Sequence, residues 1–180
     1  MNRLAPRLAA LALCAACGLA LAQPRTPPQG AVERVQRLAQ SGDVQQALAL
    51  AAAHLEANPD DVQMRFVRAN ALAQSGQAEQ AEAELESLTR NHPELAEPWN
   101  NLAVRYAARG ELGKAREALE QALLADPAYA TAQENLGDVY ARLAASAWQQ
   151  AAAQAALPAE QRQRLQDKAG RLEALLPAAN

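Results

Sequence analysis

The 34 residues AEPWNNLAVRYAARGELGKAREALEQALLADPAY, from Ala96 to Tyr129, decide the fold of this chain. Gly110 is expected to end the first of two helices, because glycine adopts the left-handed backbone conformation without steric cost. Ala115 lets the second helix pack closely against the first. Pro127 then breaks the second helix and turns the chain. The segment therefore predicts a helix–turn–helix unit.

The same three residue types return at a spacing of 34 in the segments before it. The sequences around them agree, as LAQSGDVQQALAL (38–50), LAQSGQAEQAEAE (72–84) and YAARGELGKAREA (106–118) show. One such unit cannot bury its apolar face alone, so neighbouring copies must stack into a continuous core. The recurring residues are Gly42, Gly76 and Gly110, then Ala47, Ala81 and Ala115, and then Pro59, Pro93 and Pro127.

This pattern resembles the tetratricopeptide repeat (TPR) family. The second copy carries Arg65 and Leu72 where the family has an early Trp and a Tyr. The first copy is weaker, with Val35 and His54 at positions where small residues are usual. The third copy fits best, and its residues in the family's positions are Trp99, Leu102, Ala103, Tyr106, Gly110, Ala115 and Pro127. The resemblance implies an all-α TPR helix–turn–helix solenoid of three 34-residue repeats and a partial fourth, with a C-terminal capping helix.

The fourth copy departs from the pattern after a good start. It opens with ENLGDVY (134–140) but has Ala144 where a glycine would end the helix, which predicts one long helix to about Ala156. Pro158 then starts a last helix. Its apolar stripe, formed by Leu165, Ala169, Leu172 and Leu176, is expected to fold back and cap the open end of the stack. The alternative is a helix reserved for a partner or for dimerisation.

Composition agrees with an all-α protein. Half of the 180 residues are hydrophobic, mostly Ala and Leu, whereas aromatic residues make up only 3%. Ala and Leu favour helices, and the residues that favour strands are scarce. A formal net charge of −3 and few aromatic rings do not suit nucleic acid, which requires basic and stacking surfaces. Nucleic acid is therefore not expected as a partner.

The first 22 residues have the layout of a secretory signal peptide. Arg3 and Arg7 precede an uncharged run, 8–22, that ends in small residues and is too short for a comfortable membrane span. Cleavage after Ala22 would leave 180 − 22 = 158 residues without cysteine. We therefore expect an exported, periplasmic protein whose fold needs no disulfide.

Two alternatives keep the N-terminus in a membrane. In one, the apolar run is never cleaved and serves as an anchor. In the other, Cys14 or Cys17 is lipidated, although neither has both the leucine three residues before and the small residue just before that a lipoprotein signal requires. Otherwise no membrane partner is expected. The expected organisation is a signal peptide over 1–22, an extended leader over 23–30, the TPR domain over 31–156 (repeats about 28–61, 62–95, 96–129 and a partial 130–156) and the capping helix with its tail over 157–180.

The sequence offers no arrangement of residues for catalysis, a cofactor or a metal. His54 is interpreted as a packing histidine without an acid or nucleophile beside it, and His92 as a solvated turn residue. The acidic pair 60–61 falls in a turn where Asp caps the next helix, and Glu82, Glu84 and Glu86 are interpreted as a solvated charge run. We expect no enzyme, no cofactor and no metal site.

The resemblance instead implies a groove for a protein or peptide partner, lined by the first helix of each repeat. Asn and Gln side chains there donate and accept hydrogen bonds at once, which suits the backbone of a bound peptide. TPRs that clamp a C-terminal carboxylate use lysines on these faces. The first two repeats have none, so binding of a chaperone tail is not expected. The predicted groove residues are Gln36, Gln40, Phe66, Asn70, Gln74, Asn100, Asn101, Val104, Glu134, Asn135, Asp138 and Arg142.

Two functions remain open at this point. The first is a non-enzymatic adaptor or scaffold that holds a peptide or helix of its partner in the groove and helps assemble or regulate an envelope complex. The acidic residues Glu134 and Asp138 would then favour a basic ligand. The second is a structural subunit that self-associates through its outer or C-terminal helices.

Overall fold

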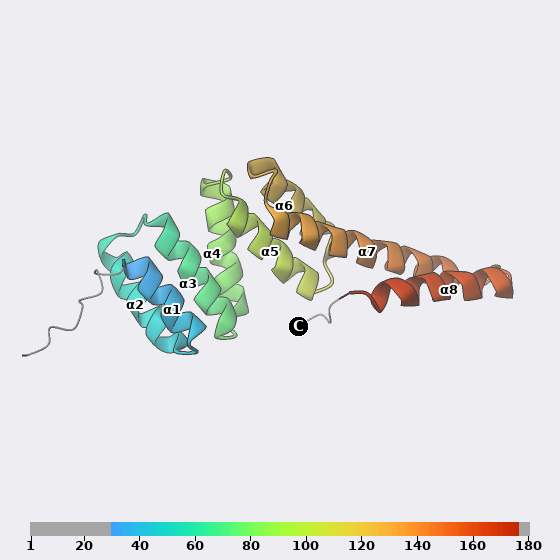
Figure 1. Cartoon of the computed structure of the whole chain (residues 1–180), viewed down its shortest axis with the longest axis horizontal. Coiled ribbons are helices and arrows are strands. Elements are labelled where there is room, and N and C mark those ends of the chain that lie inside the picture. Colours follow the sequence, from blue (N-terminus) through green and yellow to red (C-terminus); the bar gives the residue numbers. More distant parts are fainter. Residues whose placement is uncertain (1–29, 177–180) are drawn as a thin grey trace, which may run out of the picture.

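The computed structural model describes residues 30–176, and the signal peptide and most of the leader that the sequence predicts lie outside them. The described chain forms α-helices joined by short turns and contains no strand (Figure 1). The first six helices form three antiparallel pairs, as the repeat predicts. The helices are α1 Ala31–Gln40, α2 Val44–Ala57, α3 Val62–Gln74, α4 Ala78–Asn91, α5 Ala96–Ala108, α6 Leu112–Ala125, α7 Ala130–Ala152 and α8 Ala159–Glu173. The expected all-α solenoid is confirmed.

The turn inside each repeat has the predicted left-handed glycine. Gly42, Gly76 and Gly110 have φ angles of 89°, 79° and 76°. After Gly76, the amide of Gln77 donates to the carbonyl of Leu72 at 3.0 Å, which satisfies a carbonyl at the end of α3. No neighbouring atom lies within 4 Å of a Cβ built on these glycines. Backbone conformation, not crowding, therefore requires glycine here.

The other two recurring residues also act as predicted. Ala47, Ala81 and Ala115 are completely buried, so each second helix packs closely against the first helix of its pair. Each of α2, α4 and α6 ends two residues before the proline of its repeat. Because proline cannot continue a helix, the chain turns there toward the next pair.

The apolar core is divided into two main clusters. One joins α1, α2 and α3 around Val35, Met64 and Val67, and the other joins α5, α6 and α7 around Leu119 and Val139. The first helices α1 and α3 pack against each other, as do α5 and α7, whereas α3 and α5 approach each other less closely.

A small third cluster connects the two halves of the core. It consists of Ala69 of α3, Leu85 of α4 and Leu102 of α5, with Phe66 and Tyr106 packed against it. We call this set the linking cluster. The linking cluster, which lies at the junction between the second and third repeats, therefore has fewer buried residues than either main cluster.

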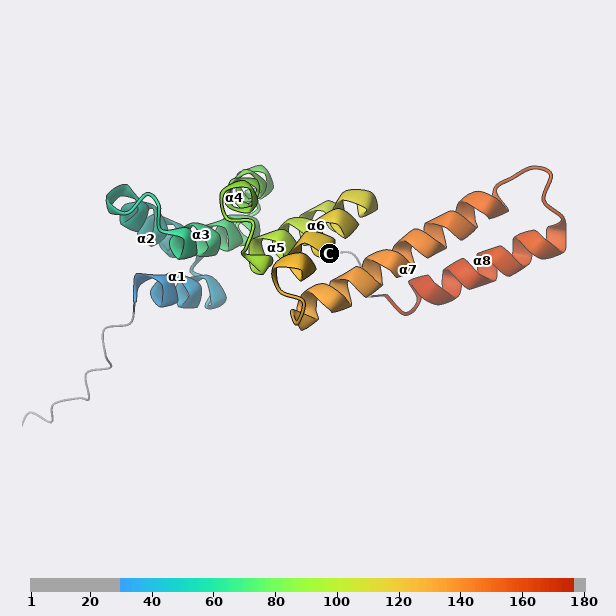
Figure 2. The same ribbon diagram turned by 90° about the horizontal axis from the view of Figure 1, so that it is seen from above.

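The C-terminal helices form a long hairpin. α7 ends at Ala152, four residues before the expected end, and a turn leads to Pro158 at the start of α8. Arg162 Nη2 donates to the carbonyl of Leu157 at 3.1 Å and so holds this turn. α8 folds back along α7, as expected, and both helices extend away from the other repeats (Figure 2). Ala145 of α7 and Ala169 of α8 are buried.

Candidate functional site: an asparagine chain on the first helices

The predicted groove residues lie on α1, α3, α5 and α7, the first helices of the four repeats. In Figure 2, α4 and α6 lie toward the upper side of the molecule and α1 toward the lower side, whereas α7 rises from the lower side to the far end of the hairpin. The groove residues differ widely in exposure. Gln36, Gln40, Gln74 and Glu134 are exposed. Val104 of α5 is 49% exposed, which is unusual for a large apolar residue in this protein.

Four of the predicted residues form a chain of hydrogen bonds across three helices. Asn135 Nδ2 of α7 donates to Asn100 Oδ1 of α5 at 2.8 Å. Asn100 Nδ2 donates to Asn101 Oδ1 at 3.3 Å, and Asn101 Nδ2 donates to Asn70 Oδ1 of α3 at 2.7 Å. We call these four residues the asparagine chain. It connects three consecutive repeats through side-chain amides alone.

The four residues of the asparagine chain differ in burial: one is buried and three are partly accessible. Asn100 is only 4% exposed, and its amide both accepts from Asn135 and donates to Asn101. A buried amide without partners is costly, so these bonds stabilise the fold. Asn70, Asn101 and Asn135 are only partly buried. Each amide nitrogen has two hydrogens, so these three retain hydrogen-bonding capacity toward solvent or a ligand.

Phe66 contributes to the interior as well as to the predicted groove. It is partly buried and packs against the linking cluster on α3, α4 and α5. Asp138 and Arg142 are also only partly buried, on α7. The structure thus brings the asparagines into direct contact. Gln36 lies on α1, which contributes no residue to the asparagine chain, and Glu134 is the neighbour of Asn135 on α7.

The interpretation of His54 as a histidine without a nearby acid is wrong. Its Nε2 lies 2.8 Å from Asp61 Oδ2. Asp61 also caps α3, as predicted, because its Oδ1 accepts from the amide of Met64 at 3.0 Å. That backbone hydrogen bond and the contact with His54 lower the pKa of Asp61 against the opposing effect of burial. The pair therefore ties the end of α2 to the start of α3.

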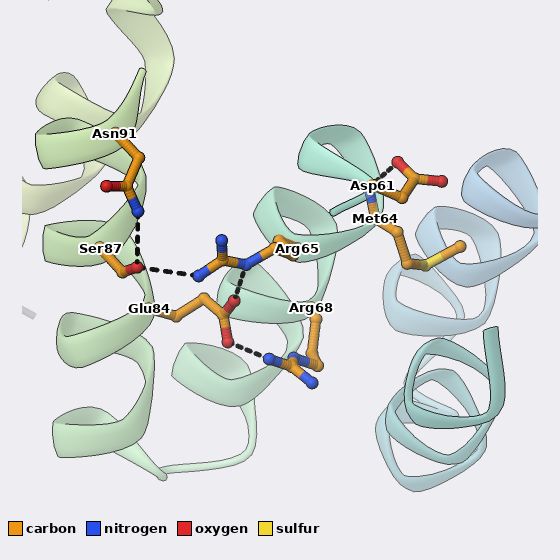
Figure 3. Close-up of polar contacts among 7 residues, drawn as sticks. All are labelled: Asp61, Met64, Arg65, Arg68, Glu84, Ser87 and Asn91. Atoms are coloured by element: carbon orange, nitrogen blue, oxygen red, sulfur yellow. Dashed lines mark hydrogen bonds and ion pairs between the residues drawn. The ribbon is translucent and has the colours of Figure 1, made fainter. Parts of the chain in front are cut away.

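The interpretation of Glu84 as part of a solvated charge run is also wrong. Glu84 is 9% exposed and lies between two arginines of α3 (Figure 3). Its Oε1 accepts from Arg65 Nε at 2.9 Å, and its Oε2 accepts from Arg68 Nη2. Arg65 Nη2 also donates to Ser87 Oγ at 2.9 Å. We call Arg65, Arg68 and Glu84 the ion cluster.

The ion cluster occupies positions that are apolar in the next repeat. A shift of 34 residues places Arg65, Arg68 and Glu84 on Trp99, Leu102 and Ala118 of the third repeat. The second repeat therefore holds charged groups where the third has an aromatic ring and two apolar side chains. This correspondence is visible in the sequence, and comparing the copies position by position would have found it.

A second group of charges links the second and third repeats at the α5–α6 turn. Arg109 of this turn reaches Glu82 of α4 through both Nη atoms, and its Nε donates to Glu111 Oε1 at 2.7 Å. Arg109 and Lys114 lower the pKa of Glu111 to about 2 by hydrogen bonding. Desolvation, followed by the negative charges of nearby Glu86 and Glu82, raises the pKa of Tyr106.

Residues 30–176 contain no group of three or more His, Cys, Asp or Glu side chains that could hold a metal ion. Within the same part of the chain, no helix is both long and apolar enough to cross a membrane.

Comparison with known proteins agrees with the repeat architecture. A family model described as a tetratricopeptide repeat matches residues 38–105, and one described as a TPR repeat matches residues 103–143. Together they span more than half of the chain. No curated protein matches the chain significantly.

Several solved structures share the fold. A thermophilic TPR protein of Thermus thermophilus superposes with a TM-score of 0.59 and 22% identity, covering 81% of this chain and 80% of that one. MamA from Desulfovibrio magneticus gives a TM-score of 0.55 and 19% identity, covering 81% and 73%. The first TPR of Spaghetti (RPAP3), bound to the HSP90 peptide SRMEEVD, gives 0.58 and 18%, covering 63% and 90%. At these identities the likeness concerns the fold alone.

Proposed function

Because this chain belongs to the tetratricopeptide repeat family, we propose that it is a non-enzymatic adaptor that binds a peptide or helix of a partner protein along its first helices. One solved structure with the same fold holds a peptide, the HSP90 segment bound to the first TPR of RPAP3. The matching family models describe repeat modules and not enzymes. Recognition would then rest on shape and hydrogen bonding.

The asparagine chain is the observation that carries this proposal. Its three partly exposed amides lie on α3, α5 and α7, first helices of repeats, which the resemblance to the family implies as the lining of a peptide groove. Their mutual hydrogen bonds restrict the orientations of the amide planes before a ligand arrives, which reduces the entropy lost on binding. Val104, which is 49% exposed on α5, supplies an apolar contact on the same face.

Site-specific photo-crosslinking in the cell tests the proposal. The photoreactive residue replaces Val104, because Asn101 is bonded to Asn70 and a crosslinker there would break the asparagine chain. Ala53, an exposed residue of α2, is the matched control position. A discrete partner captured from position 104 and not from position 53 is the expected result. Equal capture from both positions, or self-crosslinks alone, would contradict binding on this face.

We further propose that the protein is exported and acts in the cell envelope. The predicted signal peptide, 1–22, supports this location, and it lies outside the described residues. Mass spectrometry of the protein recovered from its native host gives the test. A chain that begins at Gln23 is expected, whereas an intact Met1 or a lipid on Cys14 or Cys17 would mean a membrane-held protein.

A structural role through self-association is the second candidate. The α7–α8 hairpin extends away from the other repeats, and Leu175 beside it is 81% exposed. Sedimentation velocity over a range of concentrations separates the two candidates. A monomer at all concentrations favours the adaptor. Oligomers that dissociate with Leu175→Ser, but persist with Val104→Ser, would favour the structural subunit.

A further inference from the structure

A pocket of about 510 Å³ lies between α5 and α6, away from the asparagine chain. Its wall from α5 is formed by Trp99, Leu102 and Tyr106, and Ala118 lies on the α6 side. At 3.6 residues per turn, these three α5 residues share the side of the helix opposite its predicted groove residues. The pocket is therefore a surface separate from the one proposed to bind the peptide.

The lining of this pocket differs from that of the corresponding pocket one repeat earlier. The corresponding pocket one repeat earlier, of about 430 Å³, is lined by α2 as well as by α3 and α4. The pocket between α5 and α6 has no lining residue from α4. Trp99 and Tyr106 both pack against the core cluster of α5, α6 and α7, and both are only partly buried.

The aromatic floor suits a planar cation. The indole Nε1 of Trp99 donates to the carbonyl of Pro93 at 3.1 Å, which holds the ring in place. Tyr106 already has Arg109 and Lys114 over its ring, at 5.3 and 5.4 Å from the centroid. Within residues 30–176, the cation–π contacts involve Tyr106 and Trp148 and leave Trp99 without a cation. Tryptophan is the strongest aromatic partner for a cation.

The rim of the pocket carries carboxylates that are only weakly paired. Glu117 and Glu120 line it and share the cation of Arg116, at 3.6 and 3.5 Å, and Glu120 also accepts a hydrogen bond from the Tyr140 hydroxyl at 3.3 Å. Lys114, which also lines the pocket, is held by Glu111 at 2.6 Å. The two carboxylates therefore give the rim an excess negative charge that a cationic ligand would neutralise.

We propose that this pocket binds an arginine side chain from a basic segment of a partner protein. The guanidinium would stack on Trp99 and donate to Glu117 or Glu120. Arginine fits better than lysine because its planar group stacks on aromatic faces and forms two parallel hydrogen bonds with one carboxylate. The volume of the pocket is within the range that accommodates a small ligand. The site needs no contribution from the asparagine chain and would operate whether or not that face binds a peptide.

NMR titration of the full folded chain with N-acetyl-arginine amide tests the proposal. The protein has two tryptophans, so the indole N–H of Trp148 on the hairpin is an internal control for Trp99. We expect a saturable shift of the Trp99 signal and no comparable shift of Trp148. N-acetyl-citrulline amide has the same shape without the charge, and it should bind about fivefold more weakly.

Variants then test the rim. Glu117→Gln combined with Glu120→Gln should weaken binding of the arginine probe about fivefold, while Glu56→Gln, an exposed change on α2, should not. The proposal fails if Trp99 does not shift, if both tryptophans shift alike, or if citrulline binds as well as arginine. It also fails if the double variant binds arginine as the original chain does.

Discussion

At the scale of single residues, the ion cluster shows that the same buried position of the repeat can hold either an apolar or a charged side chain. Ala118 packs in the apolar core of the third repeat, whereas Glu84 at the same position is buried between Arg65 and Arg68. Buried ion clusters contribute little net stability, because desolvation offsets the attraction between the charges. Removal of one member is costly all the same, because it leaves the remaining charges without partners.

Glu84→Gln is therefore expected to lower the free energy of unfolding by about 2–3 kcal/mol, less than a fully buried pair because both arginines are partly exposed. Urea denaturation measures the change. Glu79→Gln on the exposed side of the same helix should change stability by less than about 0.5 kcal/mol.

The triple change Arg65→Trp, Arg68→Leu and Glu84→Ala copies the third repeat and should restore stability. A triple variant as unstable as Glu84→Gln would contradict this account.

The lowered pKa of Asp61 predicts how the free energy of unfolding changes as the pH falls. Its pKa is lowered in the folded state, chiefly by the Met64 amide, so its contribution is present above the unfolded pKa. That contribution is lost as pH falls through the folded pKa. Asp61→Asn keeps a capping side chain without the titrating group. The variant should lose less stability than the original chain between about pH 6 and about pH 3 in thermal denaturation.

The neighbouring Asp60 provides the control for this measurement. It is exposed, and Asp60→Asn should follow the pH profile of the original chain. Equal acid sensitivity of Asp61→Asn and Asp60→Asn would show that Asp61 does not contribute as proposed.

At the scale of helices, α5 connects the proposed sites. One side carries Asn100 and Asn101 of the asparagine chain, and the opposite side carries Trp99, Leu102 and Tyr106 at the pocket. A sequence repeat specifies such a helix well, because Pro93 precedes its start and Gly110 follows its end. It specifies less well which neighbours the side chains meet.

Asn100→Ala measures how much the asparagine chain contributes to the fold. It removes the acceptor of Asn135 and the donor to Asn101, and should lower the free energy of unfolding by about 1–3 kcal/mol. Val104→Ala on the same helix, at a half-exposed position, should stay within about 0.5 kcal/mol. Chemical denaturation compares the two. Similar values for both variants would show that the amide bonds add little.

The features that the sequence predicted follow from local rules, and those that it missed depend on distant partners. The left-handed turn at Gly76 and the close approach at Ala81 follow from residue size and conformation, so the period was enough to predict them. Whether Glu84 is exposed depends on arginines 16 and 19 residues away. The groove residues were assigned from the family pattern, which gives a face of a helix but does not show that Asn100 is buried. The pocket between α5 and α6 depends on the side chains that line it, and the period does not specify the space that they leave.

At the scale of the whole molecule, the division of the core into two main clusters predicts that the two halves of the protein unfold partly independently. Repeat proteins are stabilised by contacts within repeats and between neighbours, so a weaker junction lowers cooperativity there. The linking cluster of Ala69, Leu85 and Leu102 holds this junction, together with the bonds from Asn101 to Asn70 and from Arg109 to Glu82.

Leu85→Ala is expected to loosen the junction without unfolding either half. Leu85 is 1% exposed, and its truncation should cost about 2–5 kcal/mol of local stability. Hydrogen exchange should therefore accelerate in α4 and α5 while α1, α2 and α6 keep most of their protection. Leu119→Ala in the C-terminal cluster is the control, and should accelerate exchange in α5, α6 and α7. Uniform acceleration across all helices with Leu85→Ala would indicate one cooperative unit.

The asparagine chain has a further consequence, because all its hydrogen bonds run in one direction. Each of the three bonds is donated toward α3, from Asn135 to Asn100, from Asn100 to Asn101 and from Asn101 to Asn70. Rotating one amide alone would set two donors or two acceptors against each other, so the four planes have two collective orientations and unfavourable mixtures between them. A ligand group that donates to Asn70 would therefore favour one orientation at Asn135, two repeats away. The binding face would respond to the polarity of a peptide backbone as one unit, and so distinguish the two directions in which the same segment can lie.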